Sequence, residues 1–206
     1  MNIVFLFNAE SRDYQRVITD YKKKLGPARA LAFVKCKDNT KSLLPPVIDF
    51  LYENDIKPMP FEIDKAVQMR NEQFHDVAKV FDNSLLHQDP YTFFVTSDRL
   101  VNVKQGNLTD CLNIAAQLLH GNKEVLSVDF QPEFTFGSQR LNDLYSRVDG
   151  FTLSPAVVRT RDFWIATQLS LNHQNQTFPV VFNQMFGALS NSQLRYLSFN
   201  REIATS

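Results

Sequence analysis

The feature that most constrains the fold is an alternation of apolar strand-like runs with helical patterns in the first half of the chain. Asn2 to Phe7 is an almost continuous apolar run, which is typical of a strand buried on both faces. Helical and strand-like patterns then alternate as far as Tyr91 to Thr96, a second apolar run that follows Asp89-Pro90. This order predicts an α/β fold with a single Rossmann-like, mostly parallel central sheet flanked by helices.

The same patterns predict the individual elements. We expect strands over residues 2–7, 28–35, 56–63, 91–96, 124–130, 148–153 and 194–199. We expect helices over residues 13–25, 43–52, 64–81, 109–120, 160–171 and 180–189, with Thr109 and Thr160 as caps. Pro58 and Pro60 interrupt the third strand, which places it near an edge of the sheet. No repeat or clear linker interrupts the pattern, so residues 1–206 are expected to form a single domain.

The composition excludes several classes of protein. The 206 residues are 44% hydrophobic and 21% charged, which excludes global disorder. The formal net charge is zero, so there is no basic footprint for nucleic acid. No stretch approaches the ~20 apolar residues that span a membrane. Cys36 and Cys111 lie far apart, as expected for free thiols in a reducing compartment. We therefore expect a cytoplasmic protein with no nucleic-acid partner and no membrane span.

Polar residues follow three of the expected parallel strands. They are Asn8, Lys37-Asp38 and Ser97-Asp98. Because ligands of open α/β sheets sit at the carboxyl ends of the strands, these positions form the candidate site. The chain has no GxGxxG, GxxxxGK[ST], GxSxG or HExxH motif. An enzyme that binds phosphate here needs another source of positive charge, and a divalent metal held by a carboxylate is the obvious one.

The segment from Tyr91 to Val103 resembles glycosyltransferases of the A-form (GT-A) fold, in which an apolar strand runs into an Asp-x-Asp motif. Val148 to Ser154 looks like that family's later strand, which carries a glycine beside the donor sugar. Phe182 to Gly187 and Leu194 to Asn200 resemble its late Asp-Gln helix and the strand that ends in Asn. The resemblance spans nearly the whole chain. It is closest to the small family-8-like branch and to a domain of an algal large-DNA-virus glycosyltransferase.

The resemblance implies a hexosyltransferase that moves a sugar from a UDP-sugar donor to a glycan or glycoprotein acceptor, assisted by Mn²⁺ or Mg²⁺. It implies a nucleotide-binding half over about 1–103 and an acceptor and donor-sugar half over about 104–206. It also implies membership of a larger multidomain chain, in the host cytoplasm if the protein is viral. The implied site residues are Phe7, Asn8, Lys37, Asp38, Arg70 and Ser97 for the nucleotide; Gly150, Asn183 and Gln184 for the sugar; Asp98 and His173 for the metal; and Asp98 and Asp149 for catalysis.

The chain departs from the family pattern at two of these places. Thr96 replaces the first aspartate of the motif, and Asn183 stands where the family often has aspartate. Asp98 and Asp149 also fit ordinary turn aspartates, and His173 fits an exposed loop histidine. Two other functions stay open: a non-catalytic nucleotide- or glycan-binding module of the same fold, and an assembly protein whose 18 phenylalanines form a subunit interface. Inversion or retention at the anomeric centre is left open.

A charged helix start lies outside these motifs. Arg159, Arg161 and Asp162 open the helix expected over 160–171, and one of them is a candidate to reach phosphate or an acceptor. Ordinary complementation of the helix dipole explains Asp162 equally well. Trp164 is expected to pack in the core, although a tryptophan beside a sugar site can also stack on a pyranose ring.

Overall fold

The computed structural model describes residues 1–25, 28, 30–63, 89–96, 107–130, 139–151, 155–172, 178–187 and 195–200. Its strands are β1 (Asn2–Asn8), β2 (Ala30–Lys37), β3 (Ile56–Ile63), β4 (Tyr91–Thr96), β5 (Val125–Asp129), β6 (Gln139–Arg140), β7 (Tyr145–Val148), β8 (Ala156–Arg159) and β9 (Arg195–Phe199). Its helices are α1 (Tyr14–Leu25), the short 3₁₀ helix η1 (Asp38–Leu43), α2 (Leu44–Glu53), α4 (Asn107–Gly121), α5 (Thr160–Asn172) and α6 (Phe178–Gly187).

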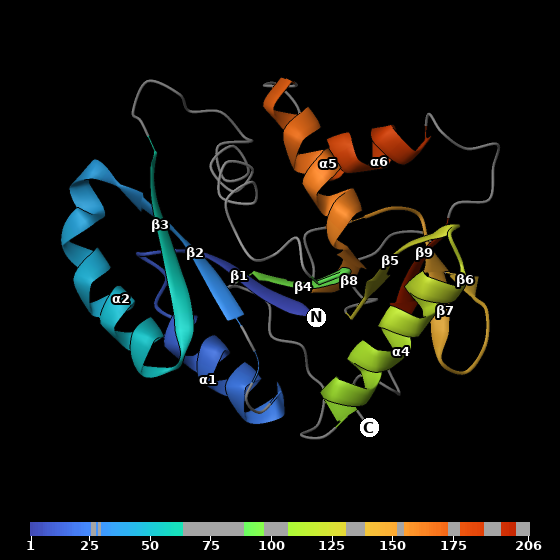
Figure 1. The fold of residues 1–206 in the computed structure, drawn as a ribbon, viewed down its shortest axis with the longest axis horizontal. Coiled ribbons are helices and arrows are strands. Elements are labelled where there is room, and N and C mark those ends of the chain that lie inside the picture. The colour runs from blue at the N-terminus through green and yellow to red at the C-terminus, as the bar shows by residue number, and fades with distance from the viewer. Residues whose placement is uncertain are drawn as a thin grey trace.

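The described strands form one nine-stranded sheet in the order β3-β2-β1-β4-β8-β5-β9-β7-β6 (Figure 1). Strands β3, β2, β1 and β4 are parallel to one another, and β5 and β9 run the same way. β8 and β7 run against them. The predicted α/β fold with a mostly parallel sheet is therefore confirmed, as is the edge position of β3. The carboxyl ends of β1, β2 and β4 share one edge of the sheet, which we call the carboxyl edge.

Both faces of the sheet are covered by helices, and this explains the continuous apolar runs of the strands. Phe5 on β1 faces a core that is shared with α1, α2 and α4. Its neighbours Val4 and Leu6 face a second core, to which α5 and α6 contribute Phe163 and Phe182. Figure 1 shows the same division, with α5 and α6 on the opposite side of the sheet from α1 and α4. The central strand β1 therefore has apolar side chains on both faces.

The phenylalanines build these cores rather than an outer surface. Phe93, Phe130 and Phe199 form a chain of rings with centroids 5.3 and 5.0 Å apart across the sheet. All three are at most 2% exposed. No phenylalanine is among the large hydrophobic side chains that are exposed in the described part of the molecule. The phenylalanines whose side chains the structure describes therefore lie in the cores or pack against them, and the assembly-protein alternative stays open.

Local signals place most helix ends. Pro45 and Pro46 occupy the first turn of α2, where a missing backbone N–H costs nothing. Asp55, just after α2, adopts φ of 56°, the left-handed conformation that commonly ends a helix. Cys36 and Cys111 are buried free thiols, as expected. None of the helices in the described ranges has the length and hydropathy of a membrane span.

Several predicted boundaries are wrong. The strand expected over 148–153 is β7, which ends at Val148, and β8 follows as a separate strand that was not predicted. α4 begins at Asn107, so Thr109 lies inside its first turn and is not its cap. The Thr160 hydroxyl shares a hydrogen bond of 2.9 Å with the Thr92 hydroxyl. The helix expected over 64–81 lies outside the described residues.

Candidate functional site

The carboxyl edge collects the polar strand ends, as expected. Asn8 is the last residue of β1 and is exposed, and its register partner on β2 is Lys35. β2 continues for two residues to Lys37, and Asp38 then opens η1. The backbone at Asn8, Lys37 and Asp38 therefore lies at neighbouring strand ends. This is where open α/β sheets bind nucleotides.

The start of α1 also faces this edge. The Ser11 N–H donates to the Asn8 carbonyl at 2.9 Å, which closes the turn between β1 and α1. α1 has no acidic residue in its first turn, and Lys22, Lys23 and Lys24 lie in its last turn. Asp13 directly precedes that turn, and its carbonyl accepts the first hydrogen bond of the helix from the Val17 N–H at 3.0 Å. The amino end of α1 therefore carries an exposed carboxylate beside its backbone partial positive charge, and it does not by itself favour an anion.

The Phe7 side chain does not point into open space. It is 4% exposed, and its ring stacks on Tyr14 with centroids 5.2 Å apart and planes 3° apart. Tyr14 in turn meets Phe50 edge-on at 5.5 Å. The ring of Phe7 thus packs against the start of α1, next to the turn that follows β1. A direct contact between this ring and a nucleotide stays a prediction.

Four of the predicted site residues, Arg70, Ser97, Asp98 and His173, lie outside the described residues. Thr96, which ends β4 directly before Ser97, is described and pairs with Leu6 on β1. Among the residues that the structure describes, no group of three or more His, Cys, Asp or Glu side chains is arranged to hold a metal. The described residues therefore do not by themselves fit a metal centre, and the predicted ligands Asp98 and His173 stay predictions.

Gly150 and Asn183, which the sequence resemblance assigns to the donor sugar, lie together. The Phe151 N–H donates to Asn183 Oδ1 at 2.8 Å, and Asn183 Nδ2 donates to the Phe151 carbonyl at 3.1 Å. A Cβ at Gly150 would lie 3.1 Å from Asn183 Oδ1, so only glycine fits here without displacing Asn183. Asn183 therefore binds α6 to the chain after β7. Gln184, the next residue of α6, is exposed.

Asp149 lies at a different edge from Asn8. β7 runs antiparallel to β9, and its last residue, Val148, pairs with Tyr196 near the start of β9. Because β9 runs in the same direction as β1, the Asp149-Gly150 turn leaves the sheet at the edge where β1 and β4 begin. We call this the amino edge. The Asp149 side chain is exposed. The structure does not bring Asp149 together with Asn8, and the strand directions argue against a shared site.

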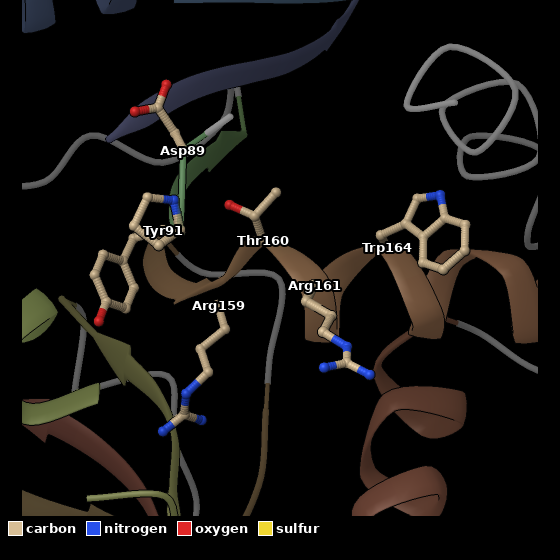
Figure 2. A pocket seen from close by; sticks show the side chains of 7 residues that line it. Asp89, Tyr91, Arg159, Thr160, Arg161 and Trp164 are labelled. Carbon is tan, nitrogen blue, oxygen red and sulfur yellow. The ribbon is translucent and has the colours of Figure 1, made fainter. Parts of the chain in front are cut away.

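The amino edge also carries a pocket of about 520 Å³ that the sequence did not indicate. It lies where β4 begins and β8 ends, and its lining includes Asp89, Tyr91 and the first turns of α5 (Figure 2). Arg161, which opens the helix expected over 160–171, and Trp164, which packs against the core as expected, belong to this lining. The signal in the sequence was their helical i, i+3 spacing, but nothing local connects them to Asp89.

Arg159 belongs to the lining as well, but its guanidinium serves the fold. It donates to the carbonyls of Leu119, Asn122 and Val125 at the end of α4 and the start of β5. It also lies 3.4 Å from Asp162 Oδ2. Burial raises the pKa of the Asp162 carboxyl above its ordinary value of 3.8, and this effect outweighs the opposite effects of Arg159 and Arg161.

Comparison with known proteins shows the fold. No protein-family model matches the chain, and no curated protein sequence matches it. The structure of S. aureus TarS matches with a TM-score of 0.54 and 10% identity, over 98% of this chain and 35% of that one. S. aureus TarS 1–349 matches with a TM-score of 0.51 and 14% identity, over 96% of this chain and 58% of that one.

The same S. aureus protein in complex with UDP-GlcNAc matches with a TM-score of 0.50 and 14% identity, over 89% of this chain and 53% of that one. These structures have the GT-A-like fold of glycosyltransferases, so the chain has that fold. It spans between about one third and three fifths of the length of the matched chains.

Proposed function

We propose that this chain is a nucleotide-sugar glycosyltransferase domain that takes a UDP-sugar as donor and a glycan or glycoprotein as acceptor. The observation that carries the proposal is the fold match over 98% of the chain. A structure with the same fold holds UDP-GlcNAc. The assignment to a family-8-like viral hexosyltransferase within a larger cytoplasmic chain rests on the sequence resemblance and is part of the proposal.

The carboxyl edge supports the placement of the donor. The ends of β1 and β2 supply Asn8, Lys37 and Asp38 for the nucleoside. In the transfer, a bond forms between an acceptor oxygen and the anomeric carbon. The bond from that carbon to the UDP oxygen breaks, and UDP leaves with the electron pair. Charge develops on the leaving phosphate, so positive groups at this edge lower the barrier.

A divalent cation held by Asp98, with His173 as a further ligand, is a separate part of the proposal. When bound, such a cation neutralises the diphosphate and stabilises it as a leaving group. Thr96 ends β4 at the carboxyl edge, and Asp98 is the second residue after it in the sequence. The described residues contain no group of three or more His, Cys, Asp or Glu side chains that could hold the cation instead.

Thermal unfolding with UDP tests both parts. UDP at one hundred times its dissociation constant stabilises a folded protein by about 2.7 kcal/mol. For a chain of this size we expect the melting temperature to rise by roughly 5–10 °C in the presence of Mn²⁺. ADP should give a smaller shift, and EDTA should reduce the effect of UDP. No shift with any uridine nucleotide would refute the donor assignment, and equal shifts with Mn²⁺ and EDTA would refute only the metal.

One observation favours a second function. Thr96 stands at the end of β4 where the family has the first aspartate of its motif. The loss of this carboxylate favours a module that binds a UDP-sugar without turning it over. A measurement of slow donor hydrolysis distinguishes the two functions. A transferase should release UDP from a UDP-sugar in the presence of Mn²⁺, whereas a binding module should show the thermal shift without any release.

A further inference from the structure

The outermost strands of the sheet, β3 and β6, differ in length. β3 has eight residues and lies at one end of the strand order, and β6 has two and lies at the other (Figure 1). Within the described residues, no strand pairs with the outer side of either one. An outermost strand presents backbone N–H and C=O groups on which a strand of another molecule can pair. The outer side of β3 is therefore the place where two copies of this chain could join their sheets.

The prolines of β3 decide which of its residues bond to β2. The ladder between β3 and β2 is parallel and unbroken over all eight residues of β3. In such a ladder each residue directs its N–H and C=O to the same side, and consecutive residues alternate between the two sides. Because proline has no N–H, the unbroken ladder requires that Pro58 and Pro60 face away from β2. Lys57 and Met59, which alternate with them, therefore bond to β2.

The outer side of β3 consequently lacks donors in its central part. Pro58 and Pro60 are consecutive residues on that side, so two neighbouring N–H groups are missing there, while both carbonyls remain. A further strand that paired here would bury those carbonyls, and some of its own, without a hydrogen-bond donor. Such unpaired backbone groups cost free energy, so the pairing is disfavoured.

Other features of the two outermost strands act in the same direction. The Lys57 side chain of β3 is exposed, and pairing would remove part of its hydration. At the other end of the sheet, both residues of β6, Gln139 and Arg140, are exposed. A very short outermost strand with a charged side chain is a poor template for a further strand. Of the two, only β3 is long enough to need a specific barrier.

We propose that Pro58 and Pro60 close the outer side of β3 and so keep the chain from joining its sheet to that of a second copy. The inference rests on the ladder between β2 and β3 and goes beyond the donor site, because it requires neither UDP nor a metal. It also restricts the assembly-protein alternative. An assembly of this chain would have to use a surface other than the outer side of β3.

The double variant Pro58→Val with Pro60→Val tests the proposal, because valine restores both N–H groups and favours strands. We expect sedimentation velocity to show that the double variant forms dimers or larger species at least about tenfold more tightly than the wild type, since paired strands regain backbone hydrogen bonds. Pro46→Ala is the matched control, because it removes a proline from the first turn of α2 and leaves β3 unchanged. Its self-association should equal that of the wild type.

A folded double variant that associates no more tightly than the wild type would overturn the proposal, and thermal unfolding shows whether it is folded. Hydrogen exchange in the wild type decides the matter if the double variant does not fold. The N–H groups of Lys57 and Met59 should exchange slowly because they bond to β2, and that of Glu62, which faces outwards, should exchange faster. The reverse order would overturn the proposal, because the prolines would then face β2. The UDP thermal shift is measured separately, so failure of this proposal is distinguishable from failure of the donor assignment.

Discussion

The side-chain amide of Asn183 forms hydrogen bonds with the backbone of a neighbouring segment. Both of its polar atoms bond to Phe151, and its own helix packs against that segment through Phe182 and Phe151, whose ring centroids lie 4.5 Å apart. A side-chain amide with both polar atoms engaged has less capacity left for a sugar hydroxyl. Asn183 therefore positions the turn at Gly150, and its predicted contact with the donor sugar is the weaker interpretation.

A double-mutant cycle tests this positioning role. Gly150→Ala introduces a Cβ that would lie 3.1–3.3 Å from Asn183 atoms, so we expect a loss of about 1–3 kcal/mol in the free energy of unfolding. Asn183→Ala leaves the Phe151 N–H and carbonyl without this partner and should cost a similar amount. Because the alanine side chain removes the obstacle, the double variant should lose less than the sum by at least about 0.5 kcal/mol.

Urea unfolding of the two single variants and the double variant measures the cycle. Gly121→Ala is the control, since a Cβ there meets nothing within 4 Å and the position ends α4. It should change the free energy of unfolding by no more than about 0.5 kcal/mol. Strict additivity of Gly150→Ala and Asn183→Ala would show that the two residues do not constrain each other.

Among the elements, the strands of the parallel half were the most predictable. β3 and β4 have the predicted bounds. β4 is marked locally by an apolar run that follows Pro90, and β3 was recognised even though Pro58 and Pro60 interrupt it. β8 was missed because it has only four residues and its partners, β4 and β5, are distant in the sequence. Pairing of this kind is decided by the whole sheet, and no local pattern records it.

The same limit applies to the candidate site. The rule that parallel strands expose their carboxyl ends at one edge was enough to group Asn8 with Lys37 and Asp38. An Asp-Gly pair, in contrast, does not reveal which way the strand before it runs, so the sequence alone could not assign Asp149 to either edge. The amino-edge pocket depends on contacts such as that between Thr92 and Thr160, which are 68 positions apart. Sequence periodicity carries no information on such contacts.

Asp162, which lies beside Arg159 where β8, α4 and α5 meet, predicts an effect of pH on the stability of the fold. The Asp162 side chain is 19% exposed, and burial raises the pKa of its carboxyl above 3.8 despite the nearby Arg159. Protonation is therefore easier in the folded state than in the unfolded state. The raised pKa of Asp162 adds to the free energy of unfolding. This contribution is complete below pH 3.8 and is lost as the pH rises through the raised pKa of the folded state.

Urea unfolding of the wild type and of Asp162→Asn at several pH values between about 3 and 7 measures this effect. The asparagine does not titrate, so the stability of the wild type relative to the variant should fall as the pH rises. Asp13→Asn, at an exposed carboxylate before α1, controls for the loss of a surface charge. A relative stability that rises with pH would mean that the ion pair with Arg159 outweighs burial.

At the scale of the whole molecule, the sheet separates two candidate sites by its two edges. The carboxyl edge has the polar strand ends and the start of α1, and the amino edge has the pocket and the Asp149-Gly150 turn. The strand directions therefore set the Asp149-Gly150 turn and the pocket apart from the proposed donor site.

The two edges make opposite predictions for the two aspartates that the resemblance assigns to catalysis. Asp98 follows β4 at the carboxyl edge, so Asp98→Asn should lower Mn²⁺-dependent release of UDP from a UDP-sugar by about 10²-fold or more, because a cation supplies several kcal/mol of charge stabilisation. Asp149 leaves β7 at the amino edge and is exposed, so Asp149→Asn should change this rate by less than about threefold, which corresponds to under 1 kcal/mol. The two substitutions remove the same charge from the same side-chain shape, which makes each the control for the other, and equal melting temperatures would show that both variants fold. If Asp149→Asn lowered the rate as much as Asp98→Asn, the two residues would have to meet at one site, and the separation of the edges inferred from the strand directions would be wrong.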